Sequence, residues 1–233
     1  MRLNMKALVV ACALILGVAA KAQALPIGLA LVLDESGSIS ATDWNNQKAG
    51  YAAAINNVVL ANGSVAIGVW KFDDTIENVF PVTIIASAAD KTNLINAINA
   101  MVQGGGNTAI GDAVTAAKNG LVAFGLANFS RALIDVSTDG ENNTGSNPTT
   151  ASNAAIAAGI AQVNCLGVGG VADCTWNPAA SLDFSATSFA SFQSVLEQKL
   201  AVETGRVPEP ASLTLVGLGL TGLARRWRKR QAA

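Results

Sequence analysis

Three separate segments of the sequence place acidic and hydroxyl side chains in a pattern that suits metal chemistry. The first is Asp34-Glu35-Ser36-Gly37-Ser38, which follows the aliphatic run ending at Leu33. The second is Gly106-Asn107-Thr108, and the third is Thr138-Asp139-Gly140. Each comes just past an expected strand or at an expected helix start. Oxygen ligands therefore gather at three points where the chain leaves its apolar core.

Two carboxylates held about 4 Å apart repel by ~4 kcal/mol at an effective dielectric near 20, so Asp34 and Asp139 facing one another need a cation. Carboxylate and hydroxyl oxygens are hard ligands, which favour Mg²⁺ first, with Mn²⁺ or Ca²⁺ as alternatives, over zinc. Gly37 lets the backbone turn tightly enough for Ser36 and Ser38 to point at one ion. The alternative for this segment alone is a polar turn that caps a helix.

Strand and helix patterns alternate along the chain. Strands are expected at residues 27–33, 65–72, 75–83, 131–137 and 163–168, with a weaker sixth strand at 182–186. Helices are expected after the capping boxes Ser40/Asp43 and Ser87/Asp90, near residues 108–124 and 149–160, and over 189–200. Pro81 makes 75–83 an edge strand, because a central strand needs every amide N–H.

This alternation predicts an α/β fold with a doubly wound, mostly parallel sheet and helices on both faces. In such sheets, ligands bind at the carboxyl ends of the strands, where the winding direction reverses. The three oxygen-rich segments are expected to converge there.

The pattern Asp34-x-Ser36-x-Ser38, the threonine of GGGNTAIGDAV and the aspartate of STDGENN resemble the metal-ion-dependent adhesion site (MIDAS) of von Willebrand factor type A (VWA) domains. The resemblance spans about residues 27–200 and implies a Rossmann-like VWA fold with an antiparallel edge strand. It implies that Ser36 and Ser38 bind the ion directly, and that Asp34, Thr108 and Asp139 bind it directly or through water. One coordination position would stay open for an acidic group of a partner. The loop at 169–178 and the weak sixth strand depart from the family pattern.

Other polar residues near these segments have two interpretations. Asp112 lies one helical turn, ~6 Å, beyond Thr108 and either supports the ligands or is a solvated helix acid. Asp135 stands ~13 Å along its strand from Asp139, so we expect a hydrogen-bonded buried acid there. Glu35 alternates away from the ion, and a contact with a partner is one role for it. Asn142 and Asn143 belong either to the rim of the site or to an ordinary surface loop.

Both ends of the chain have the composition of targeting segments. Residues 1–24 have the charged, apolar and small-residue order of a secretory signal peptide. Residues 207–233 resemble the PEP-CTERM sorting signal, with a Pro-Glu-Pro motif, an apolar helix at 211–224 and an arginine-rich end. That resemblance implies processing by an exosortase-type protease, transient membrane association through the helix, and a Gram-negative cell surface or extracellular matrix. The alternative is an uncut membrane anchor.

Between these segments, residues 25–206 form one expected domain with seven basic and fifteen acidic residues, a net charge of −8. A nucleic-acid partner is therefore not expected, since the basic residues concentrate in the targeting tail. Cys165 and Cys174 either form a disulfide in an oxidising compartment or leave Cys165 as a buried thiol.

The sequence thus predicts an exported binding module that captures an acidic group of a protein, peptide or acidic polymer through a divalent cation. Catalysis is not expected, because the chain has no histidine and Ser36 and Ser38 serve as ligands. A metal-dependent hydrolase and a structural matrix protein with a vestigial site are the alternatives.

Overall fold

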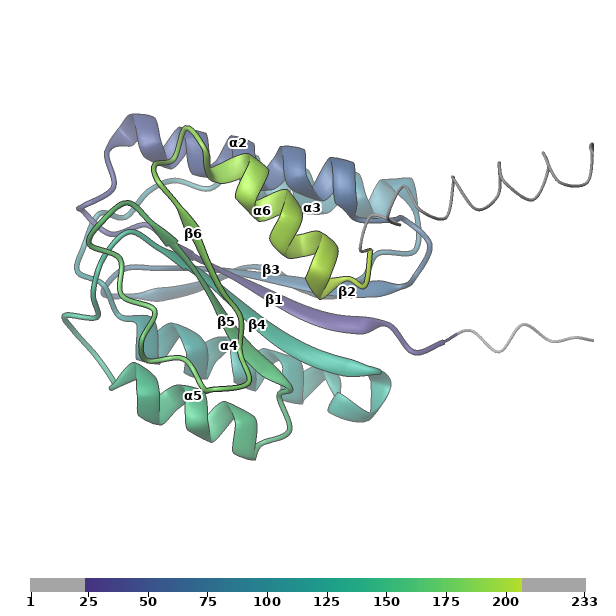
Figure 1. The fold of residues 1–233 in the computed structure, drawn as a ribbon. Helices are drawn as coiled ribbons and strands as arrows, with labels where there is room; N and C mark the ends of the chain where they lie inside the picture. The colour runs from purple at the N-terminus through teal and green to yellow at the C-terminus, as the bar shows by residue number, and fades with distance from the viewer. Residues whose placement is uncertain (1–23, 207–233) are drawn as a thin grey trace, which may run out of the picture.

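The computed structural model describes residues 24–206 and shows a six-stranded sheet between two layers of helices (Figure 1). The strands are β1 (Ile27–Asp34), β2 (Val65–Phe72), β3 (Ile76–Ile84), β4 (Arg131–Thr138), β5 (Gln162–Val168) and β6 (Asp183–Ala186). Their order in the sheet is β3-β2-β1-β4-β5-β6. All neighbours are parallel except β2 and β3, which run antiparallel. The expected doubly wound α/β sheet is confirmed.

Five α-helices and one short 3₁₀ helix cover the described sheet. They are α2 (Ala41–Val58), α3 (Ala88–Asn99), α4 (Ile110–Phe124), η1 (Leu126–Asn128), α5 (Pro148–Ala157) and α6 (Phe192–Glu203). Helices α2, α3 and α6 lie over one face of the sheet, and α4 and α5 lie over the other (Figure 1). Each face has its own apolar core, because alternate residues of the central strands point to opposite sides.

Local signals place most helix starts correctly. Ser40 caps α2 by accepting the Asp43 N–H, and Ser87 forms a complete capping box with Asp90 at the start of α3. Pro81 lies in the edge strand β3 as predicted. Helix α5 stops at Ala157, earlier than predicted, and Gly159 beyond it has a φ of +102° that favours glycine. Helix α4 begins at Ile110, so Thr108 lies in the loop before it.

The sixth strand forms, but with only four residues, and it pairs in parallel with β5. The predicted signal peptide, apart from Ala24, and the predicted C-terminal apolar helix lie outside the described residues. Within residues 24–206, no helix is both long enough and apolar enough to cross a bilayer.

Candidate metal centre

The site lies where β1 and β4 end side by side. These strands are parallel neighbours with Leu33 opposite Ser137, so Asp34 and Thr138 come next on their respective strands. The Thr138 hydroxyl donates a hydrogen bond of 2.6 Å to Asp34 Oδ2. Segments one hundred residues apart in sequence therefore meet at one edge of the sheet, as the winding predicts.

A chain of hydrogen bonds joins four of the five predicted ligand residues. The Ser36 N–H donates to Asp34 Oδ1 at 2.8 Å, which folds the Asp34-x-Ser36 turn back on itself. The hydroxyls of Ser36 and Ser38 lie 3.1 Å apart, and the Ser38 hydroxyl donates to Asp139 Oδ1 at 2.8 Å. Asp34, Ser36, Ser38 and Asp139 are thus brought together, as predicted.

Thr108 approaches this group from the loop before α4. Its backbone N–H donates to Asn143 Oδ1 at 2.8 Å, and its carbonyl accepts the Asn143 N–H at 3.0 Å. The residue is only 3 % exposed, and its hydroxyl has no hydrogen-bond partner among residues 24–206. A β-carbon on Gly140, the residue after Asp139, would lie 3.9 Å from Thr108 Oγ1. The free hydroxyl therefore lies against the Asp139 loop.

The two carboxylates of the site are each in surroundings that raise their pKa. Burial, and to a smaller extent the negative charge of Asp139, raise the pKa of Asp34 to about 6, although the hydrogen bonds from Ser36 and Thr138 act to lower it. Burial also raises the pKa of Asp139, and the charge of Asp43 adds to that shift. Both carboxylates are thus held in surroundings that disfavour two bare negative charges.

These residues fit a hard divalent cation. Two carboxylates and three hydroxyls supply oxygen donors alone, and the Thr108 hydroxyl, which no described residue binds, is free to contact an ion. No cluster of three or more histidine, cysteine or acidic side chains suited to a metal occurs within the described part of the chain. The donor set is therefore that of a hydroxyl-rich site.

The loop that delivers Thr108 is fixed by acids that the sequence did not identify. The amides of Gly106 and Asn107 donate to Asp73 Oδ2 and Asp74 Oδ2 at 3.1 and 3.0 Å, and Asn107 Nδ2 donates to Asp74 Oδ1 at 2.9 Å. A β-carbon on Gly104 or Gly106 would overlap these carboxylates. The run of three glycines beside an expected metal ligand was the available signal.

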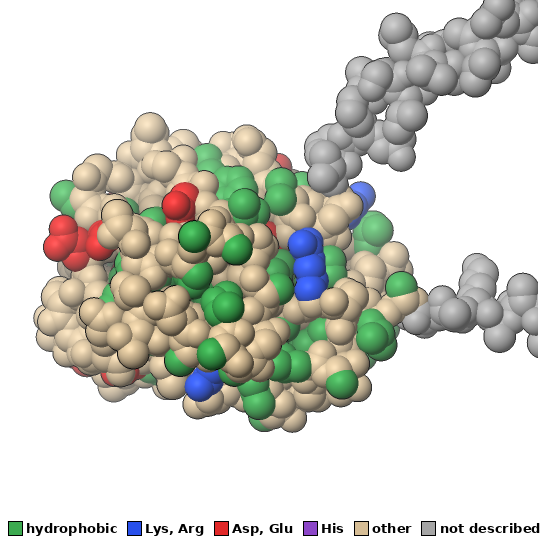
Figure 2. Space-filling model, turned by 60° about the horizontal axis from the view of Figure 1, so that its bottom comes forward, with side chains coloured by type: hydrophobic (Ala, Val, Ile, Leu, Met, Phe, Trp, Pro, Cys, Tyr) green, Lys and Arg blue, Asp and Glu red, His purple; other side chains and the backbone are tan. Residues whose placement is uncertain are grey.

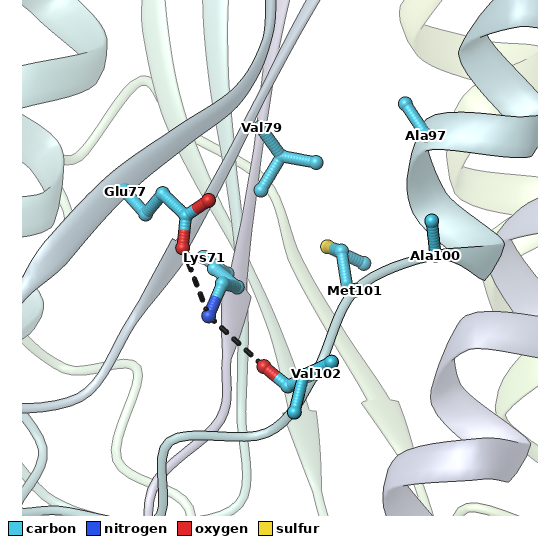
Figure 3. Close-up of a pocket in the computed structure, with 7 residues that line it drawn as sticks. All are labelled: Lys71, Glu77, Val79, Ala97, Ala100, Met101 and Val102. Carbon is cyan, nitrogen blue, oxygen red and sulfur yellow. Dashed lines mark hydrogen bonds and ion pairs between the residues drawn. The ribbon is translucent and has the colours of Figure 1, made fainter.

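Glu35 has a structural role, so its suggested contact with a partner is wrong. Both its carboxylate oxygens accept hydrogen bonds from Lys71 at 3.0 Å, and Oε2 also accepts the Gly104 N–H at 2.9 Å. Lys71 further donates to the Val102 carbonyl at 2.9 Å and pairs with Glu77 at 3.1 Å (Figure 3). A hollow of about 330 Å³ opens beside Lys71, but the ammonium is already engaged by these groups.

The remaining polar candidates hold the loop after Asp139. Asp112 Oδ1 accepts hydrogen bonds from the N–H and the hydroxyl of Ser146. Asn142 Oδ1 accepts the Gly111 N–H at 3.3 Å, and Asn143 binds Thr108. Asp112, Asn142 and Asn143 therefore join the Asp139 loop to the start of α4 and so support the ligands.

Asp135 is a buried acid, as expected, but its partner is a lysine. Lys199 of α6 is fully buried and pairs with Asp135 and, at 2.6 Å, with Glu203. Asn164 of β5 donates to Glu203 at 2.7 Å. Burial and the charge of Asp135 raise the pKa of Glu203 to about 7. This cluster attaches α6 to the strand that leads to Asp139.

Cys165 and Cys174 form a disulfide, which decides between the two alternatives left open by the sequence. The bond ties the loop after β5 back onto that strand. Within this loop, the Asp173 N–H donates to the Gly140 carbonyl at 3.2 Å. The loop at 169–178, which departs from the family pattern, therefore borders the candidate metal site.

Comparison with known families assigns the domain. A family model described as "Protein of unknown function (DUF1194)" matches residues 24–207. The chain belongs to this family. A second model, the PEP-CTERM protein-sorting motif, matches residues 206–229, which confirms the predicted sorting signal and indicates export and sorting to the cell surface of a Gram-negative bacterium. No functionally curated protein matches the DUF1194 chain.

Solved structures confirm the VWA type of fold. Proximal thread matrix protein 1 from the mussel byssus, in a structure with a zinc-occupied MIDAS motif, superposes with a TM-score of 0.67 at 19 % identity, over 78 % of this chain and 48 % of that one. The pilus adhesin SpaC from Lactobacillus rhamnosus GG, in an open conformation, gives 0.62 at 15 %, over 78 % and 30 %. A von Willebrand factor type A structure from Catenulispora acidiphila gives 0.64 at 16 %, over 78 % and 43 %. The match thus covers about half or less of these longer chains.

Proposed function

We propose that this protein is an exported binding module that captures an acidic group of a partner through a divalent cation. Asp34, Ser36, Ser38, Thr108 and Asp139 would hold the ion. The bound ion would supply an open coordination position for a carboxylate oxygen. The observation that carries the proposal is the convergence of these five side chains, with Thr108 only 3 % exposed and its hydroxyl without a hydrogen-bond partner among the described residues.

The orientation of the domain supports a role at a surface. Arg206, the last described residue, donates a hydrogen bond to the Val58 carbonyl at the end of α2, whereas α2 starts just after Ser38. An 18-residue helix is about 27 Å long, so the sorting signal begins at the opposite end of the domain from the site. Both described termini lie at that end (Figure 1). A tethered domain would therefore present the metal site outward.

A threonine-to-valine pair gives a sharp test of the site. Thr108→Val removes a hydroxyl that no described residue binds, so it should leave the stability of the ion-free protein nearly unchanged. The same change should abolish or strongly reduce stabilisation by Mg²⁺, which reaches ~2.7 kcal/mol at 100 times the dissociation constant. Thr115→Val is the matched control, because Thr115 binds only the Gly111 carbonyl within α4. Its response to Mg²⁺ should equal that of the wild type.

The measurement is the melting temperature of the purified protein with chelator and with Mg²⁺, Mn²⁺, Ca²⁺ or Zn²⁺. An equal ion response of Thr108→Val and wild type would refute the assignment of Thr108. No response to any ion in the wild type would favour the structural matrix protein with a vestigial site.

We propose binding rather than catalysis, because Ser36, Ser38 and Asp139 bind one another and would serve as ion ligands. Turnover of an ester, phosphate or glycoside that disappears in Thr108→Val would overturn this. Affinity capture from cell-surface and matrix fractions, with and without divalent ion, should yield a partner that chelator releases.

A further inference from the structure

The rim of the candidate metal centre is acidic. Residues 34–43, 73–74, 104–112 and 138–147 contain eight acidic residues and no lysine or arginine. Four of the acids are at least partly exposed and are not among the five ligands, namely Asp43, Asp74, Asp112 and Glu141. Asp112 is bound by Ser146, and we consider the other three, Asp43, Asp74 and Glu141. We call these three residues the acidic rim.

Each rim residue lies close to a predicted ligand. Asp43 is near enough to Asp139 for its charge to act on that carboxylate. Asp74 binds Asn107, which precedes Thr108. Glu141 follows Asp139 by two residues. A divalent ion would offset Asp34 and Asp139, so the rim charges would remain uncompensated around the open position.

Several basic residues of the described chain are engaged by other groups, among them Lys48, which binds the Met101 carbonyl. Lys71 is buried against Glu35. Arg131 and Arg206 bind carbonyls at the opposite end of the domain, and Lys91 binds carbonyls near the end of α2. Figure 2 shows this separation on one face, with acidic side chains mainly toward the left, where the metal-site loops lie, and basic ones nearer the centre and right.

A ligand for this surface must therefore combine two features. It needs an acidic group for the open coordination position, and it needs positive charge around that group to face the acidic rim. A polymer with a carboxylate on every unit would bring further negative charges toward the same rim and be repelled.

We propose that the site selects a carboxylate flanked by basic side chains, presented by a lysine- or arginine-rich segment of a protein, over acidic polymers. This rests on the proposed function, since the ion must provide the anchoring contact. The rim then sets specificity and the rate of encounter through long-range attraction, which salt screens beyond about 8 Å at physiological ionic strength.

Short synthetic peptides test the proposal on the purified full-length protein. Three peptides have a central glutamate flanked by lysines, by serines or by glutamates, and a fourth has a central glutamine flanked by lysines. Binding is measured with Mg²⁺ and with chelator, at low and physiological salt. The lysine-flanked glutamate should bind about tenfold more tightly than the serine-flanked one, as expected for several charge pairs at about 8 Å in water. The glutamate-flanked peptide should bind most weakly.

Rim variants connect this preference to named residues. Asp43→Asn and Glu141→Gln should each weaken the lysine-flanked peptide by about two- to threefold and leave the serine-flanked peptide nearly unchanged. Glu197→Gln on α6 is the matched control: it makes the same charge change at a side chain that binds Asn57 and Gln193. It should not alter either affinity.

The outcomes separate the two proposals. If no glutamate peptide binds in an ion-dependent way, the proposed function fails. If glutamate peptides bind with Mg²⁺ but the serine- or glutamate-flanked ones bind as tightly as the lysine-flanked one, only the charge selectivity fails. If the lysine-flanked glutamine peptide binds as tightly as the lysine-flanked glutamate peptide, the selectivity also fails, because binding would then need no carboxylate.

Discussion

Replacing Gly106 by alanine tests whether Asp74 fixes the loop that delivers Thr108. Gly106 is not among the glycines with positive φ, so the alanine backbone is acceptable. Its β-carbon would overlap Asp74 Oδ2, while the nearest atom of Asp73 would lie at 3.2 Å. The Asp74 carboxylate must therefore rotate away, and rotation breaks its two hydrogen bonds with Asn107.

The size of the effect follows from those two bonds. They measure 3.0 and 2.9 Å and lie at an exposed position, so each should contribute about 1 kcal/mol. Gly106→Ala should then lower the free energy of unfolding by ~2 kcal/mol. Asp74→Ala removes the same bonds and should cost a similar amount. In the Asp74→Ala background the overlap is absent, so adding Gly106→Ala should cost little.

Urea denaturation of the two single variants and the double variant measures this coupling. Gly170→Ala is the control, since nothing lies within 4 Å of its added β-carbon and its φ is not positive. A second measurement, the shift of melting temperature on adding Mg²⁺, should shrink in Gly106→Ala because Thr108 is displaced. If Gly106→Ala costs the same free energy with and without Asp74, contact with that carboxylate is not the cause and the reasoning is refuted.

Three further predictions concern the rest of the domain. Lys199→Met should destabilise the fold by about 3–5 kcal/mol in denaturant titrations, because it leaves Asp135 and Glu203 buried without a counter-charge. Because the pKa of Glu203 is raised from 4.5 to about 7, the native state holds this proton more tightly than the unfolded chain, and the free energy of unfolding should fall as pH rises through that window. Glu203→Gln should flatten that slope; an unchanged slope would exclude Glu203 as its source. Replacing Cys165 and Cys174 together by alanine should cost about 2.5 kcal/mol from loop closure, and an unchanged urea midpoint would contradict this.

The sequence predicted those features in which the interacting residues lie close together in the chain. The Ser87/Asp90 capping box and the Asp34-x-Ser36 turn are complete within four residues, so composition and spacing suffice to recognise them. The doubly wound, mostly parallel sheet was also predictable, because alternating strands and helices can wind in few ways. The same winding brings the loops that contain Thr108 and Asp139 to the edge of the sheet where Asp34 lies.

The supports of the site were missed because their partners are distant in sequence. Asp74 meets Asn107 across 33 residues, and Glu35 meets Lys71 across 36. The alternation of side chains along the chain suggested that Glu35 faces a partner. This local pattern carries no information about Lys71, which lies on the neighbouring strand β2. Lys71 was the available clue, since a lysine within the otherwise apolar strand β2 needs a buried acid beside it. Lys199, on the apolar stripe of α6, was a similar clue to Asp135.

The acids that build the loops also determine the electrostatics of the site. Asp73 and Asp74 satisfy amide groups of the glycine loop, but amides do not cancel a full negative charge. Among the described acids of these loops, Glu35 alone pairs with a buried cation, Lys71. The scaffold that positions Thr108 therefore leaves the site with more negative charge than the two ligand carboxylates alone would give. A divalent ion should relieve that repulsion as well as bind its ligands, so ion binding and loop order should be coupled. The same surplus charge would remain at the rim once the ion is bound, and so would act on whatever approaches the open position.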